Sequence, residues 1–333
     1  MNFSLIICTY KRPQALLTLL QSVKQQSLYP DAILIVDGSP DDATKIVLDQ
    51  NAFQNLNYFK VEEKYRGLTK QRNYGISKVQ KLSEVVCFLD DDTVLASNYF
   101  EEIIKTYTIY PEALGVGGYI CNEVAWQYVG MEYEPKSNEF YFDDWKRKDG
   151  SRFVWRKKLG LDSNCLPGFL PEFSHGRSVG FLPPSGKIYE VEQLMGGVSS
   201  FHMSVFQQFQ FSTYFDGYGL YEDADFTLRL SKTGKLYLNT AAQLEHHHDA
   251  AGRPNQFAYG KMVVRNGWYV WRVKYPKPSL KAKLKWHTIT LLLTVIRATN
   301  MFTSSKRKEA FTEALGRLMG WFSLFFLRPK IQS

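Results

Sequence analysis

A continuous apolar stretch that runs directly into three carboxylates constrains this chain more than any other feature. Residues 85–89 are apolar without interruption, and Asp90, Asp91 and Asp92 follow without a spacer. An unbroken apolar run is typical of a strand that is buried on both faces, as in a parallel sheet. Unpaired carboxylates are costly to bury. The residues alone leave two alternatives open: a solvated acidic turn, or a divalent-cation site at the carboxyl edge of a sheet.

Segments with strand and helix patterns alternate along the first part of the chain. In chain order, beginning with a strand, they lie at 3–8, 14–26, 32–36, 44–50, 56–61 and 67–79. A helix at 98–110 and a short strand at 115–120 are expected after the acidic stretch. This alternation predicts βαβ units, and hence an α/β fold with a mostly parallel sheet flanked by helices.

Polar residues follow several of the expected strands. Thr9, Tyr10 and Arg12 come after the first strand, and Asp37 comes directly after the second. Because the carboxyl ends of parallel strands meet at one edge of a sheet, these side chains are expected beside the acids at 90–92. Each of them could be an ordinary strand-end cap, but acids, a base and polar groups together favour a binding site.

The pattern changes between residues 123 and 190, where aromatic residues and prolines are frequent. Two interpretations are open for this segment: a binding loop or lid, or a packed excursion with a small core of its own. After it, Gly196 and Gly197 precede a further expected strand. They would allow a ligand to approach the backbone closely, although ordinary turns also use glycine.

Acids and histidines gather again in the last third of the chain. Glu222, Asp223 and Asp225 begin an expected amphipathic helix, where the helix dipole alone would favour them. His246 and His248 belong to a run of three histidines that is internal to the chain, so one or more of them could ligate a metal.

Composition excludes several classes of protein. The chain has 333 residues, of which 44% are hydrophobic, so it is neither disordered nor of low complexity. Four scattered cysteines favour reduced thiols in a cytosolic compartment. The first apolar run is too short for a signal peptide, and no stretch reaches the roughly 18–20 apolar residues of a spanning helix.

Charge is divided unevenly along the chain. Residues 253–333 carry 16 Lys and Arg against 2 Asp and Glu, a net +14, which leaves −6 for the rest of a chain of net charge +8. This basic tail also holds apolar pieces at 286–296 and 321–327. Together they predict a monotopic anchor on an anionic membrane surface. A helical subdomain packed on the sheet, or a dimer contact, would give the same pattern.

The ordered set of motifs resembles the family 2 glycosyltransferases, inverting enzymes with the Rossmann-like GT-A fold. The matching pieces are 6–12, 33–39, 66–67, 71–76, 88–92, 196–197, 221–225, 229–230 and His246. The resemblance implies a GT-A catalytic domain over residues 1–252, in which about 123–190 is an insertion or acceptor-side region. Residues 253–333 would form a helical C-terminal extension.

The resemblance also implies roles for the acids and histidines. The triplet looks like the family's DxD motif, with Asp90 facing the ribose of a nucleotide-sugar donor and Asp92 coordinating Mg²⁺ or Mn²⁺. Asp91 would lie on the donor side, with its role undecided. His246 matches a histidine that can complete the metal shell, and His248 competes with it for that assignment.

The donor and the acceptor would meet different residues. By the same resemblance, the nucleotide base of a UDP-, GDP- or dTDP-sugar would lie near Thr9, Tyr10, Arg12 and Asp37, with Arg72 also on the donor side.

Asp223 matches the acid that removes the proton from the acceptor hydroxyl, and Glu222 is the alternative general base. Attack from the opposite face in a single displacement would invert the anomeric centre.

We therefore expect a metal-dependent inverting glycosyltransferase of the bacterial surface-polysaccharide type. It would act on a glycan or lipid-linked acceptor, at the cytoplasmic face of the cell membrane and without a nucleic-acid partner.

Two alternative functions are compatible with the same fold. A nucleotidyltransferase would need a glycine-rich loop after the first strand, which residues 9–13 lack, and an inactive carbohydrate-binding scaffold would not need Asp92 and Asp223. The sequence does not predict the oligomeric state.

Overall fold

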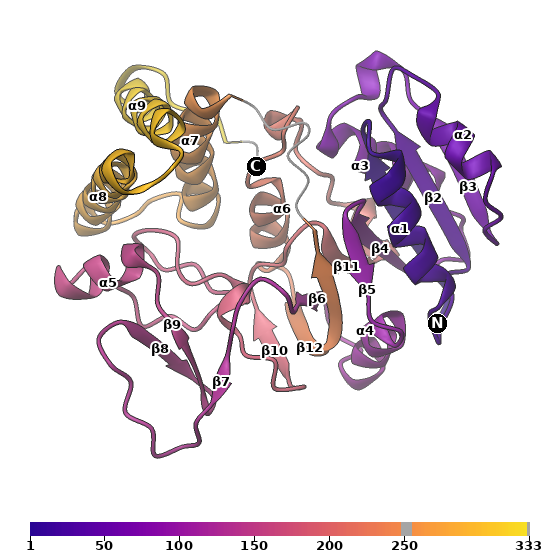
Figure 1. The fold of residues 1–333 in the computed structure, drawn as a ribbon, viewed down its shortest axis with the longest axis horizontal. Helices are drawn as coiled ribbons and strands as arrows, with labels where there is room; N and C mark the ends of the chain where they lie inside the picture. The colour runs from indigo at the N-terminus through magenta and orange to yellow at the C-terminus, as the bar shows by residue number, and fades with distance from the viewer. Residues whose placement is uncertain (248–254, 332–333) are drawn as a thin grey trace. The chain divides into compact units, whose positions relative to one another are not determined.

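The computed structural model describes residues 1–247 and 255–331 (Figure 1). Contacts within the chain divide it into two compact units. The first unit comprises Met1–Ala125 and Pro184–Gly252, and the second comprises Trp126–Pro183 and Arg253–Ser333. Most of the segment that we expected as an insertion therefore groups with the basic tail. The limits of the functional domains stay a prediction.

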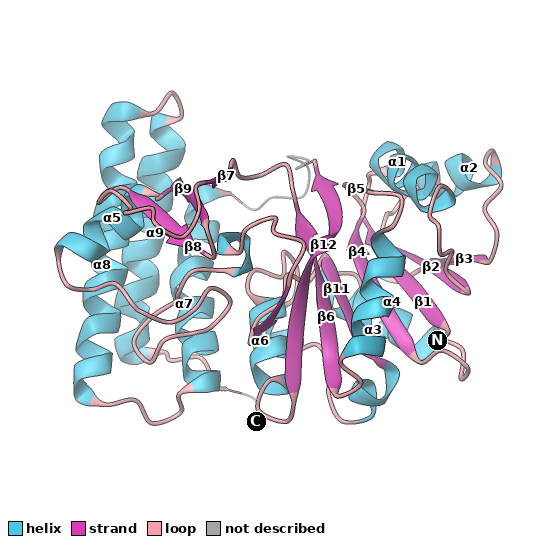
Figure 2. Cartoon of the chain, turned by 90° about the horizontal axis from the view of Figure 1, so that it is seen from below, coloured by secondary structure: helices cyan, strands magenta, loops and turns pink. Residues whose placement is uncertain are grey.

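A nine-stranded sheet forms the centre of the first unit. In order across the sheet its strands are β10 (Ile188–Val191), β12 (Lys235–His246), β6 (Ala113–Ile120), β11 (Val198–His202), β4 (Val85–Asp90), β1 (Phe3–Thr9), β2 (Ala32–Asp37) and β3 (Leu56–Lys60), with β5 (Thr93–Leu95) beside β12. β1 is parallel to β2 and β4, and β2 is parallel to β3, as the alternating pattern predicted. β11 runs antiparallel between β4 and β6, so the sheet is mixed (Figure 2).

Helices connect the strands of the first unit. They are α1 (Pro13–Lys24), α2 (Ala43–Asp49), α3 (Leu68–Lys78), α4 (Tyr99–Ile109) and α6 (Glu222–Leu230), with short 3-10 helices at Glu63–Tyr65, Met203–Gln207 and Thr213–Phe215. α1 begins at Pro13, because proline lacks only a backbone N–H that the first turn leaves unbonded. Leu16, Leu19, Leu20 and Val23 recur at helical spacing and are all buried, which fixes the face that α1 turns to the sheet.

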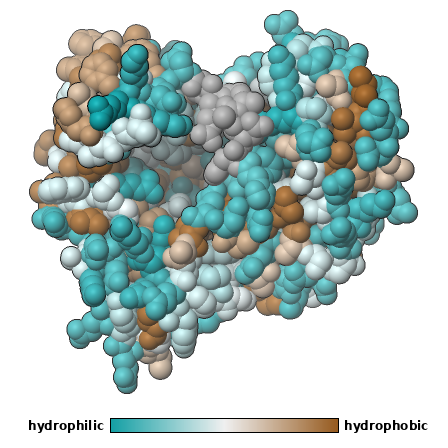
Figure 3. All heavy atoms as spheres, viewed as in Figure 1, coloured by the Kyte–Doolittle hydropathy of each residue, from teal (hydrophilic) through white to brown (hydrophobic). Residues whose placement is uncertain are grey.

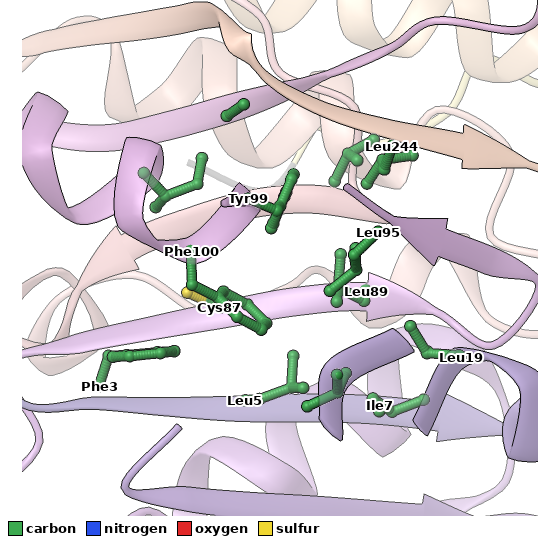
Figure 4. Packing of buried hydrophobic residues seen from close by; sticks show 14 of the residues in the cluster. Phe3, Leu5, Ile7, Leu19, Cys87, Leu89, Leu95, Tyr99, Phe100 and Leu244 are labelled. Carbon is green, nitrogen blue, oxygen red and sulfur yellow. The ribbon is translucent and has the colours of Figure 1, made fainter. Parts of the chain in front are cut away.

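The core of the first unit lies between the sheet and its helices. Leu5 and Ile7 of β1, Leu19 of α1 and Phe100 of α4 belong to one buried cluster (Figure 4). The rings of Phe3 and Phe100 are 5.1 Å apart between centroids. Burying one such side chain stabilises the fold by roughly 1.5–3 kcal/mol. The cluster therefore fixes the strand ends from which the polar residues of the expected site project.

β12 is longer than the sequence indicated. The sequence shows short apolar pieces at 235–238 and 241–244, and both belong to one strand of 12 residues. Asn239 interrupts the apolar pattern and is nevertheless buried, because its amide donates to Thr106 Oγ1 at 2.9 Å. As a consequence His246, at the end of β12, pairs with Thr93, which directly follows the three acids.

The second unit combines a small sheet with helices. The sheet has three antiparallel strands in the order β7 (Gln127–Tyr128), β9 (Trp145–Lys148) and β8 (Glu139–Phe142), and the helices are α5 (Ser151–Lys158), α7 (Gln256–Lys274), α8 (Leu280–Thr303) and α9 (Arg307–Phe326), with a 3-10 turn at Val179–Phe181. Phe153 and Phe181 are buried, with ring centroids 5.1 Å apart. Part of the segment 123–190 is therefore packed around buried aromatic residues, and its role in binding stays a prediction.

The basic tail is helical, and its helices pack through small residues. A Cβ atom on Gly260 of α7 would lie 2.1 Å from the carbonyl oxygen of Glu313, and one on Gly316 of α9 would lie 2.1 Å from that of Phe257. Side chains larger than hydrogen are therefore excluded where α7 and α9 meet. Within the described residues, no helix has the length and apolar character needed to cross a membrane.

Truncation of the core should destabilise the first unit. Phe100→Ala should lower the free energy of unfolding by about 3–5 kcal/mol, because it leaves a cavity beside Phe3. Ile109→Ala in the same helix is the matched control: its side chain is 51% exposed, and the change should stay within about 0.5 kcal/mol. Urea denaturation measures both variants. Equal losses would contradict the assignment of Phe100 to the core.

Candidate active site

The three acids at the end of β4 lie in different environments. The Asp90 side chain is 39% exposed, whereas those of Asp91 and Asp92 are almost completely buried. Thr9, the last residue of β1, donates its hydroxyl to Asp91 Oδ2 at 2.7 Å. The Arg12 guanidinium donates to Asp91 Oδ1 at 3.1 Å and to Asp92 Oδ2 at 3.2 Å. These contacts offset the cost of burying two carboxylates side by side.

Burial nevertheless has the largest effect on the pKa of Asp91. It raises the pKa of this carboxyl to about 6, although the hydrogen bond from Thr9 and the charge of Arg12 both lower it. Both oxygens of Asp91 are engaged by donors of the protein itself.

Asp90, Asp92 and His246 form a group that could hold a metal ion. One ligand atom from each residue lies within 4.8 Å of the other two. His246 Nε2 is 3.0 Å from Asp92 Oδ1, and His246 Nδ1 is 3.3 Å from Glu123 Oε1. Carboxylate oxygens are the ligands that Mg²⁺ and Mn²⁺ prefer, and an imidazole nitrogen is a common further ligand. The donor set therefore fits a divalent cation.

The neighbouring acids favour a proton on His246. Burial alone would lower the pKa of this imidazole, but hydrogen bonds to Asp92 and Glu123 and the charge of Asp90 raise it to about 10. A metal ligand must be the neutral imidazole. A cation and a proton therefore compete for this side chain.

The other histidines of the run differ from His246. His247 is exposed and lies with its Nε2 3.0 Å from Glu245 Oε2. His248, which the sequence left as an alternative metal ligand, lies outside the described residues.

The residues expected to hold the nucleotide base lie at the ends of β1 and β2. The register pairs Thr9 with Asp37, so both lie at the carboxyl edge of the sheet. Asp37 is fully buried, where its Oδ1 accepts the N–H of Ser39 at 2.7 Å and its Oδ2 accepts the hydroxyl of Tyr58 at 2.9 Å. Tyr10, by contrast, exposes its ring.

The start of α6 contributes to the same site through the loop that contains Gly196 and Gly197. Asp223 Oδ2 accepts the N–H of Gly196 at 3.1 Å, and its Oδ1 accepts that of Ala224 at 2.7 Å. A Cβ atom on Gly197 would lie 2.0 Å from Asp90 Oδ2. We expected these glycines to allow the approach of a ligand. In the structure, the groups that approach them are side chains of the protein, namely carboxylates and the guanidinium of Arg72.

Arg72 and Glu222 form a buried ion pair between the two halves of the site. The two residues are 2% and 4% exposed, and the guanidinium donates to Glu222 Oε1 while lying 3.5 Å from Asp90 Oδ1. In the described part of the chain, Glu222 Oε2 is buried without a hydrogen-bond partner. Burial raises the pKa of Glu222, and the charge of Arg72 lowers it.

Burial also raises the pKa of Asp223, although the N–H groups of Gly196 and Ala224 lower it. Its carboxylate is therefore more basic than an exposed aspartate.

The structure gathers the predicted residues in the first unit. These residues are Thr9, Tyr10, Arg12, Asp37, Arg72, Asp90, Asp91, Asp92, Glu222, Asp223 and His246. Sequence reasoning missed Glu123, which follows the end of β6 and contacts His246. A strand-end acid was an available signal there. It also missed Tyr58, whose hydroxyl donates to Asp37. Tyr58 lies in the middle of β3, and no feature of the sequence marked it as a site residue.

Comparison with known proteins gives a family match over the first half of the chain. Residues 4–166 match the family model described as glycosyl transferase family 2. A glucosyl-dolichyl phosphate glucuronosyltransferase of Haloferax volcanii is 26% identical over 145 residues, which cover 43% of this chain and 44% of that protein. The O-antigen chain rhamnosyltransferase RfbN of Salmonella typhimurium is 30% identical over 111 residues, 33% of either protein. The chain thus spans less than half the length of these curated relatives.

Solved structures share the fold over nearly the whole chain at low identity. The crystal structure of S. aureus TarS 1-349 gives a TM-score of 0.52 at 14% identity, covering 97% of this chain and 80% of that one. The crystal structure of GalNAc-T7 with UDP, GalNAc and Mn²⁺ gives a TM-score of 0.54 at 14% identity, covering 99% and 59%. The likeness confirms the expected GT-A fold.

Removal of Arg72 should destabilise the first unit. Arg72→Met should lower the free energy of unfolding by about 3–5 kcal/mol, because it leaves the carboxylate of Glu222 buried and unpaired. Adding Glu222→Leu should restore much of the loss, since the double variant buries no unpaired charge. Lys45→Met, which breaks an exposed pair with Asp49, is the control and should change little. Failure of the second substitution to restore stability would contradict the pairing.

Proposed function

The chain belongs to the family 2 glycosyltransferases, and on this premise we propose that it transfers a sugar from a nucleotide-sugar donor to a hydroxyl of a glycan or lipid-linked acceptor. A single displacement would invert the anomeric centre. The observation that carries the proposal is the meeting of Asp92, His246 and Asp223 around the exposed carboxylate of Asp90. Residues suited to a cation and a residue suited to proton removal thus belong to one site.

The donor would lie along the ends of β1, β2 and β4. The exposed ring of Tyr10 is available to a nucleotide base, and Asp37 would shape the base pocket, because Ser39 and Tyr58 fix both of its oxygens. Asp90, the most exposed of the three acids, would face the ribose.

The remaining donor-side residues would act mainly by holding others. Arg12 joins Asp91 to Asp92, and Thr9 fixes the other oxygen of Asp91, so these three keep Asp92 in place. Arg72 is too deeply buried to favour direct contact with the donor, and its ion pair supports a role in positioning Asp90 and Glu222.

We propose Mg²⁺ or Mn²⁺ as the cofactor, held by Asp92 and His246 beside Asp90. The support is the donor set, two carboxylates and an imidazole with ligand atoms within 4.8 Å of one another. When bound, the cation would stabilise the negative charge that develops on the leaving diphosphate. Arg12, whose guanidinium lies 3.2 Å from Asp92 Oδ2, would hold this carboxylate in place beside the cation.

Asp223 is our choice for the general base. Two backbone N–H groups orient its carboxylate, and burial raises its pKa, which makes it a better acceptor of the proton from the acceptor hydroxyl. Glu222, the alternative, is 4% exposed and paired with Arg72. Its burial argues for a structural role.

The names of two relatives support a proposal for the class of acceptor. One is named for glucosyl-dolichyl phosphate and the other for an O-antigen chain. By analogy we propose an acceptor in surface-glycan synthesis, free or lipid-linked, and a peripheral position on the cytoplasmic face of the membrane. The donor would be a UDP-, GDP- or dTDP-sugar.

A donor screen tests the transferase proposal. Thermal denaturation of the full chain is followed with UDP-, GDP- and dTDP-sugars, each with and without Mn²⁺, because a ligand that binds the native state raises the midpoint. One nucleotide class should raise the midpoint, and only with the cation. Absence of a shift with every donor would contradict the proposal.

Asp223→Asn should separate proton removal from donor binding. Transfer should fall by roughly 10²–10⁴-fold, because the amide cannot accept the proton. The donor-dependent rise in midpoint should persist. Asp49→Asn, at an exposed position of α2, is the control and should retain transfer. A parallel loss of donor binding in Asp223→Asn would exclude Asp223 as the base.

Cation affinity should depend on pH through His246. Since its pKa is raised to about 10, metal binding at neutral pH must displace a proton, and the affinity for Mn²⁺ should rise with pH up to that value. Calorimetric titration measures the slope. His246→Gln should flatten it, and His247→Gln, the neighbouring exposed control, should not. Identical slopes in the wild type and in His246→Gln would remove His246 from the metal site.

A further inference from the structure

Helix α9 exposes most of its large apolar side chains, and its buried face consists mainly of small residues together with Leu324. Five large apolar residues, between 43% and 85% exposed, follow one another at intervals of four, four, three and four positions: Phe311, Leu315, Met319, Phe322 and Phe326. Residues at this spacing lie on one stripe of a helix. We call these five residues the outer face of α9. Figure 3 shows apolar side chains gathered where Figure 1 draws this helix.

At Gly316 and Gly320, the opposite side of α9 has no room for such side chains. It buries Ala310, Gly316 and Gly320, and α7 lies against it so closely that a Cβ atom on Gly316 would be 2.1 Å, and one on Gly320 3.0 Å, from carbonyl oxygens of α7. A helix at the surface of a soluble domain normally turns its large apolar residues inward. Here the arrangement is reversed, and a contiguous apolar surface of this kind marks an interaction site.

Along residues 253–333, which include the outer face, basic residues far outnumber acids, although Glu309 lies 3.8 Å from Lys306 at the start of α9. Of the two acids in residues 253–333, Glu313 is buried and paired with Arg297 and Arg317. At the start of α9, Lys306 precedes Arg307 and Lys308, one turn before the first exposed phenylalanine.

Beyond the end of the helix, Arg328 and Lys330 follow the last exposed phenylalanine, and both are exposed. An apolar stripe with basic residues at both ends is typical of a helix that lies in the interface of an anionic membrane.

We propose that the outer face of α9 binds a lipid surface that contains anionic phospholipids. The helix lies parallel to the membrane plane, its 20 residues spanning about 30 Å, with the apolar side chains among the acyl chains and the basic ends at the headgroups. This inference deepens the membrane location given under the proposed function, because it names the surface that binds.

A second copy of this chain is a less favourable partner for the outer face of α9 than a lipid surface. In a two-fold symmetric contact the same patch lies on both sides, which would set Lys306 and Arg307 against a surface with equally few acids. Like charges across an interface are unfavourable. Anionic headgroups satisfy both the apolar stripe and its basic ends.

Vesicle co-sedimentation of the full chain tests the proposal. The vesicles are phosphatidylcholine with or without phosphatidylglycerol. The face variant is Phe311→Ser with Met319→Ser and Phe326→Ser, and the matched control is Ile46→Ser with Leu82→Ser and Ile109→Ser, three apolar positions that are exposed in the first unit. Circular dichroism checks that each variant is folded, and sedimentation velocity measures the oligomeric state.

The wild type and the control should bind vesicles with phosphatidylglycerol. The affinity of the face variant for these vesicles should be lower by a factor of roughly ten or more. Equal binding by all three proteins overturns the proposal. So does equal binding to vesicles with and without phosphatidylglycerol. A wild-type dimer that the face variant dissociates, without vesicle binding, assigns the face to a second copy and also overturns it.

Hydrolysis of the donor in the absence of vesicles separates this proposal from the proposed function. The face variant should hydrolyse the donor like the wild type, because the substituted residues lie outside the first unit. Vesicle binding without any donor hydrolysis would contradict the proposed function alone. Hydrolysis without vesicle binding would contradict the lipid proposal alone.

Discussion

The site depends on the neutralisation of carboxylates that the fold brings to one edge of the sheet. Three cationic side chains meet these acids, each from a different element: Arg12 from the start of α1, Arg72 from α3 and His246 from the end of β12. Removing one partner of a buried pair leaves an uncompensated charge, which costs several kcal/mol. The same contacts that hold the acids in place therefore tie these elements to β4 and α6.

Two of the carboxylates are neutralised only in part. Asp90 remains partly exposed, and the Asp223 carboxylate accepts the backbone N–H groups of Gly196 and Ala224. The backbone donors fix the orientation of the Asp223 carboxylate, and burial raises its pKa although these hydrogen bonds and the charge of Arg72 lower it. Asp91 and Glu222, by contrast, are buried against arginines. The site thus separates Asp91 and Glu222, which arginines engage, from Asp90 and Asp223, to which we assign the contacts with substrates.

The sequence predicted what local patterns determine. The apolar run at 85–89 predicted β4, and the alternation of strands and helices predicted the parallel part of the sheet. It did not predict the antiparallel insertion of β11, because strand order depends on long-range pairing. The Arg72–Glu222 pair joins residues 150 positions apart, and no feature of the sequence selects these partners among many charges. For α9, composition predicted an apolar helix, but only its contact with Gly260 determines which face remains outside.

The measurement that tests the central claim most directly is the anomalous scattering of Mn²⁺ in crystals grown with the nucleoside diphosphate of the donor found in the screen. The account predicts one Mn²⁺ peak in contact with Asp92 and His246, with the diphosphate on the same cation and the base near Tyr10. A nucleotide bound elsewhere in the chain, or a cation that contacts neither Asp92 nor His246, would contradict it.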